Sequence, residues 1–266
     1  MPRDTRVFVI AEDLFARNWM SLLLVRDWRT RVVGDAGSLE RVVDGLKNAA
    51  GRIDLIIIDT EILHNEPWLA PLLEAQHAFA PGARILLVGL KPDEKLLRQS
   101  LAAAQFAGYI LKDEIYHSLA WACVLGVEGK WVLTPGLQPL VGRTGLQLRP
   151  NSVVLDGRRT LSGLTDREID VVRQAILFSV ERYDLADELA ISQDWTYGLV
   201  SGLYKKLGLV EILSGEVDPS TYLGQNRLVL DHVKGILERL KGSKKAVELE
   251  SLAFHLITTP EIEEIS

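Results

Sequence analysis

An aspartate at the end of an apolar run is the first candidate for chemistry in this sequence. Residues 54–59 read Asp-Leu-Ile-Ile-Ile-Asp, with four apolar side chains between two carboxylates. Such a run is typical of a strand in a parallel sheet that helices cover on both faces. Asp59 then lies at the carboxyl end of the strand, the edge at which open parallel sheets bind ligands. Asp59 is therefore a candidate reactive carboxylate, and the alternative is that it only caps the following segment.

The composition argues against several other kinds of site. The chain has 266 residues, 47% of them hydrophobic, which predicts two globular domains. No apolar run approaches the roughly 18 residues of a membrane span, and the first residues do not resemble a signal peptide. One cysteine, Cys123, and five scattered histidines give no disulfide, no metal cluster with ligand spacing and no nucleophile–base pair. We expect a cytoplasmic protein that does not contact membranes and is not an enzyme.

Strand and helix patterns alternate through the first half of the chain. Strands are expected at 7–10, 31–33, 54–59, 85–88 and 108–111. Each is followed by a segment with apolar residues at helical spacing, the last over 114–127. Five such alternations predict an α/β domain with a doubly wound parallel sheet and right-handed crossovers.

This order of elements, with three residues in it, resembles the receiver domain of two-component response regulators. Asp59 lies where receivers carry the aspartate that accepts a phosphoryl group from a histidine kinase, and Lys112 where a lysine pairs with that group. Tyr109 lies at the place of the family's aromatic switch residue. The resemblance implies that Mg²⁺ and Lys112 offset the negative charge during phosphoryl transfer. Residues 1–128 are the predicted receiver-like domain.

Two positions depart from the receiver pattern. Receivers carry an acidic pair after the first strand to hold Mg²⁺, whereas this chain reads Ala11-Glu12, which leaves Glu12 and Asp59 as the candidate metal ligands. Gly89 stands where receivers have a Ser or Thr whose hydroxyl follows the phosphoryl group. The sequence thus predicts an atypical receiver. It is either controlled by phosphorylation or kept as a module for protein contacts and dimerisation.

Residues 129–163 are rich in proline and glycine and predict a linker, with a hairpin over 153–155 that turns at Asp156-Gly157. The segment carries a net charge of +4, from Lys130, Arg143, Arg149, Arg158 and Arg159 against Asp156. A loose basic segment can follow a phosphate backbone, and a solvated loop is the alternative.

A helical pattern with a short turn follows over residues 164–209. Thr165 and Glu168 have the spacing of a capping box that starts a helix, and Ser192 can cap a later one. Three blocks resemble the LuxR-type helix-turn-helix domain of the NarL/LuxR class: Leu164-Thr-x-Arg-Glu168, Ala186-x-x-Leu189-x-Ile191-Ser192 and Lys206-Leu-Gly208. The resemblance implies a transcriptional regulator whose second motif helix enters the DNA major groove.

The resemblance places the DNA contacts in and after the stretch 195–202. The expected contact residues are Thr196, Tyr197, Ser201, Lys205 and Lys206. Residues 164–209 contain five basic and eight acidic residues, a net charge of −3, which disfavours binding to phosphates. The alternative to a DNA-binding regulator is therefore a phosphorylation-independent signalling scaffold that acts through protein contacts.

Residues 210–266 extend beyond the usual end of the family. A helix is expected from about 220 to 240, with apolar residues at heptad-like spacing, and a second helix carries Leu249, Leu252 and Leu256 after a basic turn over 241–245. These helices pack on their own domain or on a dimer mate, and the tail 260–266 is expected to fray. The expected partners are DNA, a histidine kinase and a second copy of the chain.

Overall fold

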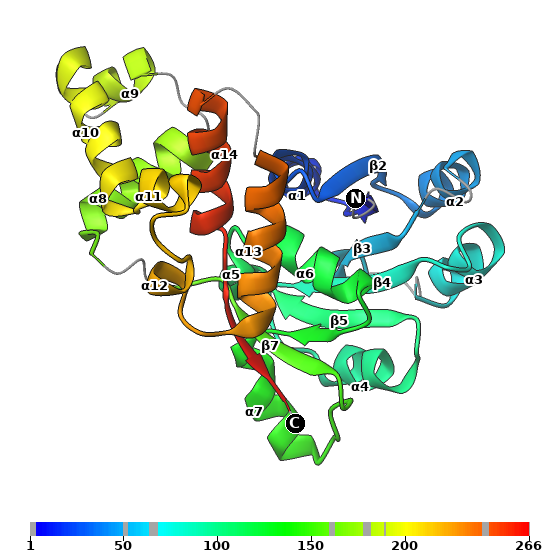
Figure 1. Cartoon of the computed structure of the whole chain (residues 1–266). Coiled ribbons are helices and arrows are strands. Elements are labelled where there is room, and N and C mark those ends of the chain that lie inside the picture. The colour runs from blue at the N-terminus through cyan, green and yellow to red at the C-terminus, as the bar shows by residue number, and fades with distance from the viewer. Residues whose placement is uncertain are drawn as a thin grey trace. The chain divides into compact units, whose positions relative to one another are not determined.

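The computed structural model describes residues 4–49, 53–63, 69–159, 163–177, 182–188, 190–240 and 245–265. The contacts divide the chain into two compact units. Unit 1 consists of Met1–Arg158 and Pro260–Ser266, and unit 2 of Arg159–Thr259. The chain therefore leaves unit 1, forms unit 2 and returns to unit 1 at its end (Figure 1).

Unit 1 is built on one eight-stranded sheet with the order β2-β1-β3-β4-β5-β6-β7-β8. The strands are β1 Thr5–Ile10, β2 Thr30–Ala36, β3 Leu55–Asp59, β4 Arg84–Gly89, β5 Phe106–Leu111, β6 Trp131–Leu133, β7 Ser152–Asp156 and β8 Glu261–Glu264. All neighbouring pairs are parallel except β7 and β8. The five predicted strands and the parallel, doubly wound arrangement are confirmed, and three further strands widen the sheet.

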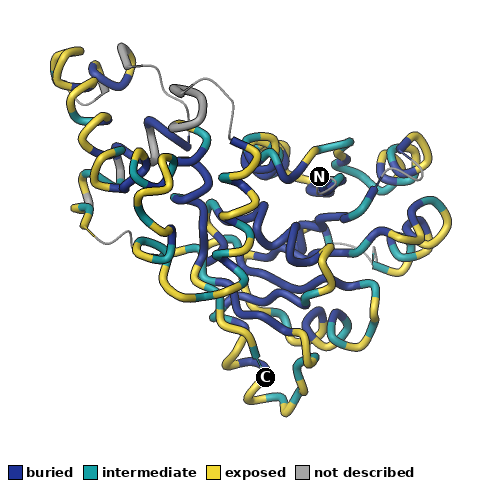
Figure 2. The backbone as a smooth tube through the Cα atoms, viewed as in Figure 1, coloured by how far each residue is buried: buried dark blue, intermediate teal, exposed yellow. Residues whose placement is uncertain are grey.

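Helices cover both faces of this sheet. They are α1 Leu14–Arg26, α2 Leu39–Asn48, α3 Leu69–Phe79, α4 Glu94–Ala102, α5 Lys112–Ile115, α6 Leu119–Val127 and α7 Gln138–Thr144, with 3₁₀ turns at Thr60–Leu63 and Pro135–Leu137. The main core packs α2, α3, α4 and α7 on one face, while α1 and α6 pack together on the other. The central strands are buried along their length (Figure 2). The helix predicted over 114–127 is broken at Tyr116, whose φ is +51°.

Residues 129–163 differ from the predicted linker because most of them belong to unit 1. β6, α7 and β7 lie within this range, and Val153 and Leu155 are fully buried. The predicted hairpin is wrong, since β7 pairs with β6 in parallel and with the distant β8 in antiparallel. The tail predicted to fray instead contains β8. A three-residue strand such as β6 is too short to show a period in the sequence, which is why the segment resembles a loop.

Unit 2 is helical within its described residues. Its helices are α8 Asp166–Val172, continued by a π-helical turn at Arg173–Leu177, α9 Arg182–Glu188, α10 Gln193–Lys206, α11 Leu209–Ser214, α12 Ser220–Leu223, α13 Arg227–Leu240 and α14 Lys245–Ile257. The helix predicted over 220–240 is split where Gly224 adopts a φ of +77°. α14 packs on α11, α13 and the π-helical turn, so the extension packs on its own domain.

Some predicted features of unit 2 lie outside the described residues. These are Leu189 of the helix-turn-helix pattern, most of the basic turn over 241–245, and the side chain of Leu249. Within the described residues, every helix is too short or too polar to cross a lipid bilayer.

Candidate functional site

Asp59 and Lys112 meet at the carboxyl edge of the sheet. Asp59 ends the buried strand β3 and is 2% exposed, and Lys112 follows β5 directly. The Lys112 Nζ donates to Asp59 Oδ2 at 2.7 Å. The other carboxylate oxygen, Oδ1, accepts from the Glu61 backbone N–H at 3.2 Å. Asp59 therefore caps the following 3₁₀ turn and also holds the charge pair implied by the receiver resemblance.

Tyr109 lies in β5 beside this pair and is fully buried. Its hydroxyl donates to the Lys91 carbonyl oxygen at 2.7 Å. Burial, together with the charge of Asp93, raises the pKa of Tyr109 to about 12, while a hydrogen bond with the Thr60 side chain acts in the opposite direction. The phenol is thus fixed in the interior of unit 1.

Gly89 ends β4, and no larger residue fits there without a shift of its neighbours. A Cβ at Gly89 would lie 2.7 Å from Thr60 Oγ1 and 3.0 Å from the Tyr109 hydroxyl oxygen. Thr60 and Tyr109 therefore fill the space beside the position that carries a hydroxyl in receivers. Thr60 is not among the predicted site residues, although its place next to Asp59 is a signal for it.

The predicted metal ligands are Glu12 and Asp59. Glu12 is exposed in the turn after β1. The buried Arg17 donates from Nη1 to the Ala11 carbonyl oxygen at 2.5 Å and to that of Glu12 at 3.3 Å, and from Nε to Asp35 at 2.6 Å. Mg²⁺ often binds through one or two carboxylates and several waters, so the two acids are suitable donors. The positive charge of the Arg17 guanidinium beside this turn opposes the binding of Mg²⁺ there. Within the described residues, no group of three or more His, Cys, Asp or Glu side chains is placed to hold a metal ion.

The helix-turn-helix part of unit 2 begins with the predicted capping box. Thr165 Oγ1 accepts from the Glu168 N–H at 3.3 Å, and Glu168 Oε2 accepts from the Thr165 N–H at 2.9 Å. Lys206 at the end of α10 donates to Glu168 Oε1 at 2.6 Å. The bond from Lys206 and those from Thr165 hold the pKa of Glu168 below its usual value. The ion pair joins the last turn of α10 to the first turn of α8.

The predicted DNA contacts of α10 separate into two groups. Thr196 is fully buried and its hydroxyl donates to the Ser192 carbonyl oxygen at 3.2 Å, so it does not belong to the exposed surface. The reason is helical spacing, because Thr196 shares a face with the buried Val200 and Leu203. Tyr197, Ser201 and Lys205 are exposed.

The exposed face of α10 is aromatic and nearly neutral. Trp195 is 55% exposed and Tyr197 59%. Lys205 is exposed and forms none of the ion pairs between described residues, whereas Lys206 is paired with Glu168. Asp194 is also exposed and offsets the charge of Lys205.

Three of the five cations in the predicted basic linker are engaged within unit 1. The Arg149 guanidinium donates to the carbonyl oxygens of Ser100, Leu101, Ala103 and Phe106, and burial lowers its pKa. Arg158 pairs with Asp156 and Glu114, and Lys130 pairs with Glu264. These contacts hold β6, β7 and β8 onto the receiver-like core and oppose a role in following phosphates.

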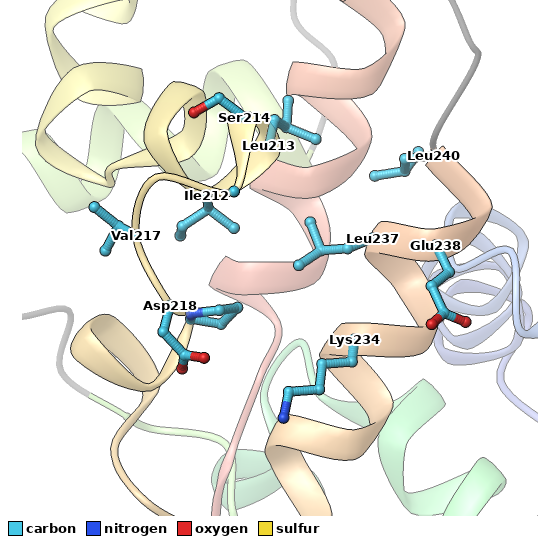
Figure 3. A pocket seen from close by; sticks show the side chains of 11 residues that line it. Ile212, Leu213, Ser214, Val217, Asp218, Lys234, Leu237, Glu238 and Leu240 are labelled. Carbon is cyan, nitrogen blue, oxygen red and sulfur yellow. The ribbon is translucent and has the colours of Figure 1, made fainter.

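Unit 2 also contains a groove of about 670 Å³ that sequence analysis did not find. It is lined by α11, the following loop and α13. Ile212 of α11 lies across from Leu237 of α13, with Asp218 and Lys234 at the border of the groove (Figure 3). Its described lining holds no histidine or cysteine and provides a contact surface rather than reactive groups.

Comparisons with known proteins found similarities among solved structures. No protein-family model and no curated protein matches the chain. Among solved structures, the response regulator ChrA of a heme-sensing two-component system is 24% identical, with 77% of this chain and 92% of that chain covered and a TM-score of 0.38. The structure of RcsB dimers bound to two parallel DNAs is 14% identical, covers 75% of this chain and 90% of that chain, and has a TM-score of 0.46. A two-component response regulator of the LuxR family from Aurantimonas sp. SI85-9A1 is 16% identical, covers 55% of this chain and 100% of that chain, and has a TM-score of 0.45. These structural neighbours are two-component response regulators.

Proposed function

We propose that this chain is a response-regulator-like transcriptional regulator that binds DNA through α10. The observation that carries the proposal is the position of α10 in unit 2, which the capping box at Thr165 and Glu168 and the Lys206–Glu168 ion pair fix against α8. In a helix-turn-helix motif the second helix lies in the major groove of DNA. Of the predicted contact residues, Tyr197, Ser201, Lys205 and Lys206 are exposed on α10 and would contact DNA.

In this proposal the receiver-like unit is a regulatory or dimerisation module. Lys112 supplies the cation that would offset the charge of a phosphoryl group on Asp59. Glu12 and Asp59 would hold the Mg²⁺ that offsets negative charge during phosphoryl transfer from a histidine kinase. A Ser or Thr at position 89, as receivers have, would fit only if Thr60 or Tyr109 shifted. Regulation without a phosphoryl switch is therefore the form we favour.

The second candidate function is a phosphorylation-independent signalling scaffold. The exposed Trp195 and Tyr197 are residue types that are enriched at protein interfaces. The exposed face of α10 also offers Lys205 as its unpaired cation among the described residues, which gives little attraction for phosphates. A scaffold would bind a defined protein partner and have no affinity for DNA.

A DNA-binding titration of the full-length chain separates these functions. A pool of random duplexes is titrated at two salt concentrations, and bound sequences are selected and sequenced. DNA binding predicts an affinity that falls with salt and a Lys205→Ala variant whose log–log salt slope is smaller by about 1. Lys95→Ala, at an exposed lysine on α4, is the matched control and should leave the slope unchanged. Absence of salt-sensitive binding would refute the proposal and favour the scaffold.

Phosphorylation of Asp59 is tested separately. The full-length chain is incubated with acetyl phosphate and Mg²⁺ and examined by intact mass. Transfer to Asp59 predicts one phosphoryl adduct that Asp59→Ala abolishes and that Asp44→Ala, at an exposed aspartate on α2, retains. If no adduct forms in the wild type, the receiver-like unit is not a phosphoryl acceptor under these conditions, and the DNA titration is unaffected by that outcome.

A further inference from the structure

The groove of unit 2 lies outside the surfaces to which the proposed function assigns a role. Helices α11 and α13 each pack on α14, and the groove of about 670 Å³ lies between α11 and α13. Its described lining includes none of the residues proposed to contact DNA. All of these lining residues fall within 210–266, the segment beyond the usual end of the family. The groove is therefore a feature of the extension and not of the helix-turn-helix.

Apolar side chains face one another across this groove. Leu213 and Val217 on one side and Leu237 on the other are only partly buried. Figure 3 shows Leu237 across from Ile212, which is 3% exposed. Apolar side chains that gather in a groove, unlike those scattered singly over a surface, mark a binding site.

The spacing of apolar residues on α13 suits a helix as the occupant of the groove. One apolar row of this helix is buried in unit 2 and consists of Val229, Val233, Ile236 and Leu240. Leu230 and Leu237 form a second row, seven residues apart, and both are half-buried. A helix with apolar residues on two adjoining faces can pack on its own domain with one face and on a further helix with the other. Leu237 thus offers an anchor for a helix that lies in the groove.

The border of the groove is acidic. Glu216, Asp218 and Glu238 are exposed there, against one exposed base, Lys234. Hydrogen bonds from Ser220 lower the pKa of Asp218, and the positive charge of Lys234 acts in the same direction, so Asp218 and Lys234 offset one another. Glu216 and Glu238 form none of the ion pairs between described residues. The groove therefore offers two uncompensated carboxylates to a basic partner.

We propose that this groove binds a short basic amphipathic helix of a partner protein. The apolar face of that helix lies between α11 and α13, and its Lys or Arg side chains face Glu216 and Glu238. The α13 wall from Lys234 to Leu240 is about 10 Å long at 1.5 Å per residue, which accommodates about two turns of the partner helix. So short a helix loses conformational freedom when it binds, so the affinity should be modest and should fall with salt. The inference does not depend on DNA binding or on phosphorylation of Asp59.

Selection from a displayed library of helix-forming peptides tests the proposal on the full-length chain. The library is randomised over one helical face and its borders. Enriched peptides should carry apolar residues at steps of three and four, flanked by Lys or Arg. Leu237→Glu should weaken their binding about tenfold, because it places a carboxylate among the apolar contacts. Val210→Glu is the matched control, since this valine is 48% exposed on α11 and does not line the groove.

Three outcomes of this selection would overturn the proposal. They are a library that yields no enriched peptide, enrichment of acidic peptides, and enriched peptides that bind Leu237→Glu as tightly as the wild type. Circular dichroism of each variant checks that it folds. Sedimentation velocity without peptide addresses a second copy of the chain as the occupant. Self-association that Leu237→Glu abolishes would assign the groove to that second copy and would also overturn the proposal.

A charge reversal at the border tests the acidic groups without touching the apolar contacts. Glu238 is exposed, so Glu238→Lys should leave the fold intact. It should weaken binding of the enriched basic peptide and strengthen binding of the same peptide with glutamate in place of its lysines. Glu40→Lys, at an exposed glutamate on α2, makes the same change in net charge and is the matched control. Equal effects of the two reversals would show that the peptide responds only to the net charge of the chain, and would contradict recognition by the border of the groove.

Discussion

The packing around Gly89 gives the sharpest test of the atypical receiver site. Alanine at this position adds a methyl group whose carbon would lie 2.7 Å from Thr60 Oγ1 and 3.0 Å from the Tyr109 hydroxyl oxygen. Both neighbours are at most 2% exposed and cannot move into solvent. Overpacking of this kind typically costs 1–3 kcal/mol, and we expect Gly89→Ala to lower the free energy of unfolding of unit 1 by about 2 kcal/mol.

Removal of the Thr60 side chain should relieve this clash. Thr60→Ala alone removes a buried hydroxyl beside Tyr109, at a cost of about 1 kcal/mol. In the double variant the alanine methyl at position 89 enters the space that the Thr60 hydroxyl leaves. The double variant should therefore be more stable than the sum of the single effects predicts, with a coupling free energy of about 1 kcal/mol.

Urea denaturation followed by tryptophan fluorescence measures these free energies. Five of the six tryptophans lie in the sequence of unit 1, and Trp195 is in unit 2, so the signal reports mainly on unit 1. Gly82→Ala is the matched control, because a Cβ at this glycine meets no atom within 4 Å. If Gly89→Ala is no more destabilising than Gly82→Ala, or if the two effects at Gly89 and Thr60 are additive, the packing argument is refuted.

Three further predictions concern unit 1. Lys112→Met leaves the buried Asp59 without its ammonium partner and should cost about 2 kcal/mol in urea denaturation, whereas the Asp59→Asn/Lys112→Met double variant should recover part of that loss. Because the pKa of Tyr109 is raised to about 12, above the value near 10 of an unfolded tyrosine, its neutral form stabilises the fold fully below pH 10, and this contribution of about 3 kcal/mol is lost as pH rises from 10 to 12. Denaturation at pH 9, 10.5 and 12 should show a flatter decline for Tyr109→Phe than for wild type, and equal slopes would contradict the burial of the phenol. Truncation of residues 260–266 removes β8 and the Lys130–Glu264 pair, so the thermal midpoint reported by tryptophan fluorescence should fall, and an unchanged midpoint would show that β8 does not stabilise the sheet.

The strands that sequence analysis found are those whose signal is local. The apolar run before Asp59 identifies β3, and the order of alternating strands and helices identifies the parallel sheet. The capping box at Thr165 and Glu168 likewise needs only its own four residues, and both of its bonds are present. These features could be predicted because one short segment contains all the groups involved.

Features that join distant segments were missed or assigned wrongly. β8 pairs with β7 across more than a hundred residues, so residues 153–155 were assigned to a local hairpin and residues 261–264 to a frayed tail. Lys206 lies where the resemblance places a DNA contact, and its ion pair with Glu168 at the start of the domain is visible only in the folded chain. Thr196 belongs to the expected contact set but faces the interior, because the direction of each α10 side chain depends on where the rest of unit 2 packs.

The sequence by itself determined the order of the secondary structure, the caps and the placement of Asp59 and Lys112 at strand ends, since these follow from periodicity and from hydrogen bonds within a few residues. Only the tertiary structure decided that Lys112 reaches Asp59, that Thr60 and Tyr109 close the space beside Gly89, and that α11 and α13 leave an apolar groove between them. The physical reason is that burial and charge pairing depend on which surfaces meet after the chain has folded, and the same side chain can be paired, buried or exposed according to its neighbours.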